Sequence, residues 1–196
     1  SLWSGTATSW VDLHPASTSR SVVYGMSGTQ QTGYALVSGN EHACVWTGTS
    51  ASWVDINPAG AAYSIAHATS GTQQVGEANI GGVLRAGHWS GTSASWVNLN
   101  PAGSVQSTAL ATTGTQQAGW AIVNGNVCAS LWSGTAASWV NLSPTGTTNS
   151  QALAASGSTQ VGYTTVGGFN RASMWTGRAG SWVNLGTIVP AGFTES

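Results

Sequence analysis

One spacing constrains the fold of this chain more than any other feature: a tryptophan recurs every 43 residues, with no insertion or deletion. These tryptophans are Trp3, Trp46, Trp89, Trp132 and Trp175. A second tryptophan follows seven residues after each of them: Trp10, Trp53, Trp96, Trp139 and Trp182. A period of about 40 to 50 residues built from short strands is typical of β-propeller blades and related repeat arrays. We therefore interpret these ten tryptophans as structural.

Each repeat contains the signals of four short strands. In the first full repeat, we expect strands at 21–27, 30–37, 42–47 and 52–57. Gly28 marks the first turn, and Ser-Gly-Asn between the second and third strands is typical of a hairpin. Pro58 ends the fourth strand, because proline cannot continue the hydrogen-bonded ladder. The last turn, Gly-Thr-x-x-Ser, would place the two tryptophans of each repeat opposite each other as a cross-strand aromatic pair.

These patterns predict an all-β fold, a β-propeller of 43-residue four-stranded blades. The small residues of the first strand suit a crowded position near a propeller axis, whereas a two-layer sandwich would show polar alternation and no fixed period. The chain holds four complete blades plus the two outer strands of another, which favours a five-bladed ring. We expect one repeat domain with a half-blade at 1–14, blades at 20–58, 62–101, 105–144 and 148–186, and a tail at 187–196.

The charge content excludes several classes of partner. The chain has no lysine, and charged residues make up 5% of it. Four scattered arginines cannot neutralise a run of phosphates, so we expect no nucleic-acid partner. Ser, Thr and Gly interrupt every apolar stretch before it reaches about 18 residues, so we expect no membrane-spanning helix.

Acids, histidines and cysteines do not show the spacing of a catalytic or metal-binding site. Asp12 and Asp55 share one repeat position, which asparagine occupies in the other three repeats, so we interpret them as turn acceptors. The four histidines fall at four different repeat positions, and no metal-ligand spacing occurs. Cys44 and Cys128 have apolar neighbours and lie in alternate repeats. We expect two buried, inert thiols that are too far apart for a disulfide.

No serine stands in a nucleophile elbow, and the glycines form no phosphate-binding loop. We therefore expect no enzymatic activity, no cofactor and no metal.

The repeat resembles the HAF family of extracellular bacterial repeats. The segments that carry the resemblance are Val23-Tyr24-Gly25, Gly33-Tyr34-Ala35, His42-Ala43-Cys44, Trp46 and Val54-Asp55-Ile56. The His-Ala-Phe triplet of that family becomes Arg85-Ala86-Gly87, Cys128-Ala129-Ser130 and Arg171-Ala172-Ser173 in the other repeats, so only its alanine persists. The resemblance implies a β-propeller-type fold and an extracellular or cell-surface location, and it carries no catalytic activity with it.

Comparison of the repeats with one another predicts where a ligand would bind. The chemistry varies most in the hairpin between the second and third strands, at one rim of the ring, and blade tips are common binding sites. The candidate residues are Asn40, Glu41, His42, Asn79, Arg85, Asn124, Asn126, Asn170 and Arg171.

The sequence favours a non-enzymatic extracellular propeller module that serves as a structural or ligand-binding unit. A glycan is one candidate ligand, because aromatic rings together with amide and hydroxyl groups suit sugars, and a protein is the other candidate. The first alternative is a self-assembling structural protein that completes its fifth blade with strands of another copy. The second is a fragment or an engineered repeat propeller with no activity of its own.

Overall fold

Short apolar stretches separated by glycine turns fold into antiparallel meanders. In the computed structural model, which describes residues 1–187, the first meander pairs β1 (Ser21–Ser27), β2 (Gln30–Val37), β3 (Asn40–Trp46) and β4 (Val54–Asp55) in that order. The first two strands have the expected bounds. The third begins two residues earlier than expected. The fourth is much shorter, because a 3-10 turn at Ser50–Ser52 precedes it.

Three further sheets repeat this meander, and each forms one blade. Blade 1 is the β1–β4 sheet. Blade 2 contains β5 (Ala61–Ser70), β6 (Gln73–Ile80), β7 (Val83–Trp89) and β8 (Val97–Asn98). Blade 3 contains β9 (Ser104–Thr112), β10 (Gln117–Val123), β11 (Asn126–Trp132) and β12 (Val140–Asn141). Blade 4 contains β13 (Ser150–Ser156), β14 (Thr159–Val166), β15 (Phe169–Trp175) and β16 (Val183–Asn184).

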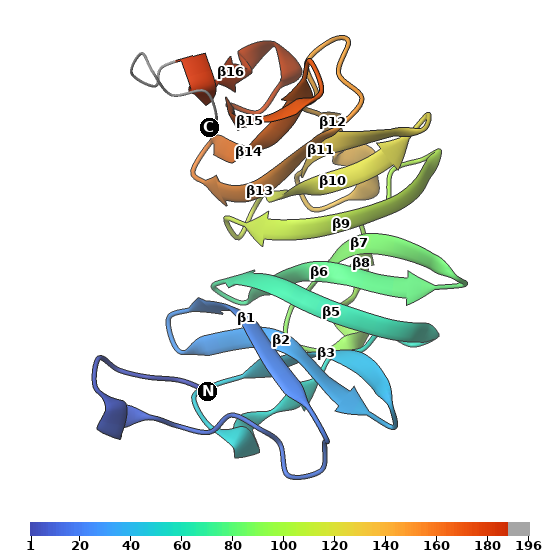
Figure 1. Cartoon of the computed structure of the whole chain (residues 1–196). Helices are drawn as coiled ribbons and strands as arrows, with labels where there is room; N and C mark the ends of the chain where they lie inside the picture. The colour runs from blue at the N-terminus through green and yellow to red at the C-terminus, as the bar shows by residue number, and fades with distance from the viewer. Residues whose placement is uncertain (188–196) are drawn as a thin grey trace.

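The blades lie in a row that runs from blade 1 to blade 4, with the N-terminus beside blade 1 (Figure 1). The first strands of neighbouring blades contact one another, β1 with β5, β5 with β9 and β9 with β13, so these are the inner strands. Residues 1–14 form the expected half-blade, in which Leu2 bridges Val11 around the 3-10 turn at Ala7–Ser9. The arrangement confirms an all-β propeller with four four-stranded blades. Of the predicted tail, 188–196 lies outside the described residues. Within residues 1–187, no helix has the length and apolar character needed to cross a membrane.

Every inner strand carries a bulge that requires a glycine on its partner. In blade 2, β5 and β6 pair Ala66 with Gly76 and then Ala68 with Val75, so that His67 is left unpaired. A Cβ atom built on Gly76 would lie 1.9 Å from the carbonyl oxygen of Ile65. The same close approach occurs in all four blades, at Gly33, Gly76, Gly119 and Gly162. The glycine in each second strand therefore lets the bulged inner strand approach closely.

The first tryptophan of each repeat joins one blade to the blade before it. Trp46, Trp89, Trp132 and Trp175 are all 0% exposed. Trp175, from blade 4, packs against Ala129, Leu131 and Leu142 of blade 3. The indole nitrogens of these four tryptophans have no hydrogen-bond partner among the described residues, so apolar contact holds them in place. The hydrophobic core is thus divided among the junctions between blades.

A buried glutamine connects the turns at each junction. Gln74 is 0% exposed. Its Oε1 accepts from the backbone N–H of Gly91, and its Nε2 donates to the carbonyl of Thr72 and to Oε1 of Gln30 in blade 1. One blade later, Gln117 Oε1 accepts from the backbone N–H of Gly134, and its Nε2 donates to Oε1 of Gln73 in blade 2. The Gln-Gln pair therefore joins blade 1 to blade 2 and blade 2 to blade 3 by a hydrogen bond. At the junction of blades 3 and 4, Gln116 Oε1 has no hydrogen-bond partner among residues 1–187.

The sequence predicted that the two tryptophans of each repeat face each other. The second does pack against the core cluster that contains the first, but its ring stacks on the first in blade 2 and not in the other three blades. In blades 1, 3 and 4 its indole N–H donates across the hairpin, to Cys44 Sγ, Ser130 Oγ and Ser173 Oγ respectively. Blade 2 has Gly87 at this position. There the Trp96 ring occupies the space of the missing side chain and lies 4.5 Å from Trp89 between ring centroids. Within residues 1–187, Trp89 and Trp96 are the only two tryptophans whose rings are in contact.

Candidate functional site

The predicted rim residues lie at the expected hairpins but do not gather into one site. They are distributed over the second and third strands and the connecting turns of four different blades: Asn40, Glu41, His42, Asn79, Arg85, Asn124, Asn126, Asn170 and Arg171. In blade 4, Asn170 accepts a hydrogen bond from Thr165 Oγ1, and the Arg171 guanidinium lies 5.5 Å from the centre of the Phe169 ring. These contacts stay within one blade.

Two of the rim residues in blade 1 have charged or polar partners nearby. His42 Nδ1 lies 2.7 Å from Asp55 Oδ2 on β4, a pair that their separate repeat positions did not predict. Glu41 lies close enough to the buried phenol of Tyr34 to influence its ionisation. The Arg20 guanidinium lies 5.5 Å from the centre of the same ring. Burial raises the pKa of Tyr34, while the positive charge of Arg20 opposes this rise and the Glu41 carboxylate adds to it.

A cluster that the sequence analysis missed begins next to Tyr34 on the inner strands of blades 1 and 2. The bulged residue of β1, Tyr24, is 53% exposed, and its ring lies 6.0 Å from Tyr34 and 5.6 Å from the bulged residue of β5, His67. His67 Nε2 lies 3.4 Å from Glu77 Oε2 on β6. These side chains form a continuous chain of contacts across the junction. We call Arg20, Tyr24, Glu41, His67 and Glu77 the polar cluster.

The repeat contained a signal for this cluster. The bulged position reads Tyr24, His67, Leu110 and Leu153 from blade 1 to blade 4, and the facing position on the second strand reads Tyr34, Glu77, Trp120 and Tyr163. Both positions differ in chemistry between blades 1 and 2, and they are ten residues apart in each repeat. Ten of the thirteen arginines, acids and histidines also precede residue 89. Ionisable chemistry is therefore concentrated in the half-blade and blades 1 and 2.

The aspartates at the end of the fourth strand are turn acceptors, as expected. Oδ1 of Asp12 and Asp55 accepts the backbone N–H two residues on, at 2.9 and 2.8 Å. Asn98, Asn141 and Asn184 make the same contact in the other blades. Within residues 1–187, no group of three or more His, Cys, Asp and Glu side chains has an arrangement that could hold a metal ion.

Both cysteines are buried and free, as the sequence predicted. Burial raises the pKa of the Cys44 thiol to about 12; the hydrogen bond from the Trp53 indole lowers it, and the Asp55 carboxylate adds to the rise. Blades 3 and 4 have serine at the position of Cys44 and keep the indole bond. Serine is therefore a replacement that the fold accepts at this position.

This burial makes the protein less stable in alkali. An unfolded cysteine has a pKa of about 8.5, so above that pH the unfolded chain loses the thiol proton while the folded chain retains it. The contribution of Cys44 is complete below pH ~8.5, and we expect it to decline by an amount on the order of 4 kcal/mol as the pH approaches 12. Urea unfolding at pH 7, 9 and 10.5 should show a smaller alkaline loss in Cys44→Ser. The pKa of Tyr34 is also raised, so Tyr34 contributes the same alkaline loss of stability to the parent protein and to Cys44→Ser. Equal losses would contradict the assignment to Cys44.

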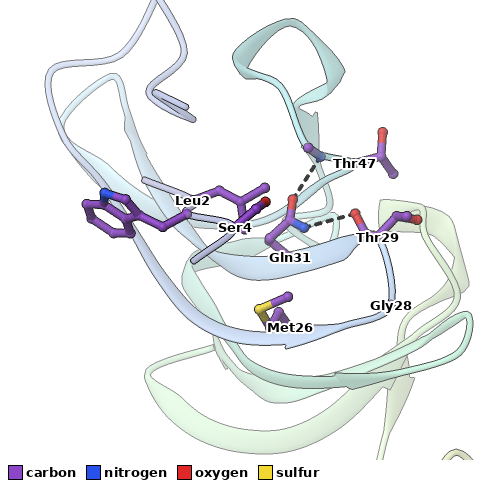
Figure 2. A pocket seen from close by; sticks show the side chains of 9 residues that line it. Leu2, Ser4, Met26, Gly28, Thr29, Gln31 and Thr47 are labelled. Carbon is purple, nitrogen blue, oxygen red and sulfur yellow. Dashed lines mark hydrogen bonds between the residues drawn. The ribbon is translucent and has the colours of Figure 1, made fainter. Parts of the chain in front are cut away.

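A pocket of about 270 Å³ lies between the half-blade and blade 1. It is lined by Leu2 and Trp3 on one side and by Met26 and Gln31 on the other. Figure 2 shows Gln31 bonded to its own turns: its Nε2 donates to the Thr29 carbonyl, and its Oε1 accepts the Gly48 N–H beside Thr47.

The next junction shows what fills the corresponding space. There Gln30, from the second strand of blade 1, accepts from Gln74 Nε2 at 2.7 Å. Within residues 1–187, Gln31 Nε2 donates to the Thr29 carbonyl of its own turn and not to a glutamine of a neighbouring blade. The pocket is therefore the unfilled inner half of a junction, and its lining has no ionisable side chain.

Comparison with known proteins supports the fold. No family model matches the chain, and no curated protein matches it. Among solved structures, the crystal structure of TolB from Acinetobacter baumannii, a β-propeller protein, superposes with a TM-score of 0.58 at 14% sequence identity. The match covers 85% of this chain and 42% of that one, so this chain spans less than half the length of TolB. The chain thus shares the β-propeller fold with TolB.

Proposed function

We propose that this chain is a non-enzymatic, extracellular β-propeller module that binds a ligand of the glycan class at the polar cluster. The observation that carries the proposal is the half-exposed Tyr24 ring beside the His67–Glu77 pair, at a junction where neighbouring blades present different chemistry. The apolar face of a sugar ring packs on an aromatic side chain. The His67 imidazole beside Tyr24, its partner Glu77 and the Arg20 guanidinium over the neighbouring Tyr34 offer hydrogen-bonding groups to the sugar hydroxyls. The Ser-, Thr- and Gly-rich, lysine-free sequence and the resemblance to extracellular repeats support the location.

Binding should depend on Tyr24 and Glu77. A glycan array probed at high protein concentration identifies the ligand, and titration calorimetry then compares variants. We expect Tyr24→Ala to weaken binding at least tenfold, because it removes the stacking surface. Glu77→Gln should weaken it less, because the amide keeps the shape and one acceptor oxygen.

Leu153→Ala is the matched control, because Leu153 occupies the same repeat position in blade 4 and is 47% exposed. It should bind like the parent protein. If the protein binds no glycan on the array, the proposal is wrong. Equal weakening by Tyr24→Ala and Leu153→Ala would show that the ligand does not bind at the polar cluster.

A second function, self-association as a structural protein, is favoured by a separate observation. Trp3 is 59% exposed, whereas its counterparts in the four complete blades are 0% exposed. Trp10, on the other strand of the same hairpin, is 51% exposed, so two large apolar side chains of the half-blade are exposed together. Exposed apolar side chains that adjoin favour an interaction surface.

A further inference from the structure

The three junctions between complete blades define what the first tryptophan of a repeat requires. Trp175 packs against Ala129, Leu131 and Leu142 of the preceding blade, which are 0%, 4% and 0% exposed. Trp89 packs in the same way against Ala43, Val45 and Ile56 of blade 1. The socket is therefore an alanine and a larger side chain on the third strand, together with an aliphatic residue that follows the fourth strand.

The half-blade presents this tryptophan without a socket. Leu2 and Val11 contact the core beneath Trp46, so the half-blade is anchored to blade 1. Trp3, which also borders the pocket next to blade 1, is 59% exposed, and Trp10 is 51% exposed. Because the half-blade is held at its inner contacts, Trp3 is presented on a fixed element.

Blade 4 has the socket without a tryptophan. The three socket positions are Ala172, Met174 and Leu185, and each is half-buried although its counterparts Ala129, Leu131 and Leu142 in blade 3 are buried. Val161, next to them on β14, is 39% exposed, whereas its counterpart Val75 in blade 2 is 0% exposed. None of these four side chains carries a charge. Among residues 1–187, Trp3 and the blade 4 socket are therefore two incompletely buried surfaces with the chemistry of one blade junction.

We propose that Trp3 of one copy of this chain occupies the Ala172–Met174–Leu185 socket of a second copy. The inference rests on the second function proposed above and is independent of glycan binding. The half-blade and blade 4 stand at opposite ends of the row of blades (Figure 1), so a second molecule is needed to bring them together. Because donor and acceptor are different surfaces, the contact is heterologous and each added copy offers a new socket.

The size of the contact sets the conditions of the test. A tryptophan buries roughly 150–250 Å², and a stable interface buries about 1,600 Å² in total. The association should therefore be weak and visible only at high concentration. Sedimentation velocity from about 10 to 500 μM is expected to show a weight-average mass that rises with concentration. Trp3→Ala should abolish this rise. Met174→Glu, which places a charge in the socket, should abolish it as well, and circular dichroism checks that both variants are folded.

Mixing the two variants gives the sharpest result. Trp3→Ala retains an intact socket, and Met174→Glu retains an intact Trp3, so together they should form a dimer that cannot grow further. A 1:1 mixture that remains monomeric, while the parent protein associates, would overturn the docking geometry.

The remaining outcomes distinguish self-association in general from the specific contact of Trp3 with the socket. Association of the parent protein that is unchanged in Trp3→Ala would leave self-association standing and overturn the Trp3 contact. A parent protein that stays monomeric at 500 μM would overturn both. A monomer whose fluorescence quenching by acrylamide is the same in the parent protein and in Trp3→Ala would show that Trp3 is covered within one molecule, and this too would overturn the proposal. Glycan binding, measured separately, is unaffected by any of these results.

Discussion

Gly76→Ala should destabilise the protein severely, by about 3 kcal/mol or more. The new Cβ atom would lie 1.9 Å from the carbonyl oxygen of Ile65 and 3.0 Å from the Cα of Ala66. Both contacts are with backbone atoms, so no side chain can rotate to relieve them, and the β5–β6 pairing would have to shift. Overpacked sites typically cost about 1–3 kcal/mol, and a backbone clash lies at or beyond the upper end of that range.

Urea unfolding measures this loss, and Gly180→Ala is the matched control. Gly180 has a φ outside the left-handed region, and a Cβ built on it would have no atom within 4 Å. Its replacement should change the free energy of unfolding by less than about 0.5 kcal/mol. A Gly76→Ala protein as stable as Gly180→Ala would contradict the close approach of the bulged strand.

Trp89→Ala should cost about 3–5 kcal/mol, the usual range for removal of a buried large aromatic side chain. Trp89 is 0% exposed and packs between blades, against Ala43, Val45 and Ile56. Its removal would leave a cavity between two sheets. The sheets cannot close this cavity without disturbing the hydrogen bonds of Gln74.

Trp3→Ala makes the same chemical change at the same repeat position, but the side chain is 59% exposed. We expect it to change stability by about 1 kcal/mol or less. Thermal and urea unfolding of both variants, at a concentration where the parent protein is monomeric, test the contrast. Similar losses in the two variants would show that burial at the junction is not what these tryptophans contribute.

The fold could be predicted because its determinants recur. A tryptophan that returns every 43 residues and a glycine at each turn specify four copies of one meander, and β1 and β2 have the predicted bounds. Asp12 and Asp55 could be identified as turn acceptors because asparagine replaces them elsewhere.

Features that depend on packing between repeats could not be predicted in this way. The tryptophans of one repeat were expected to pack on each other, but Trp89 packs on the blade before it, and only the missing side chain of Gly87 brings Trp96 against it. Prediction of the polar cluster would have required knowledge of the bulge, because regular pairing does not place His67 beside Glu77. The rim asparagines were chosen for their variability, a property that does not show whether side chains converge.

The division of the core among the junctions affects how the protein unfolds. A single sheet has no apolar interior of its own, because the tryptophan that would fill it comes from the following sheet. The smallest unit that loses its structure cooperatively is therefore a pair of neighbouring sheets. Loss of either outermost sheet breaks one such pair, whereas loss of a middle sheet breaks two. Unfolding should consequently begin at the ends of the row and proceed inward, in the manner of a linear array with nearest-neighbour coupling.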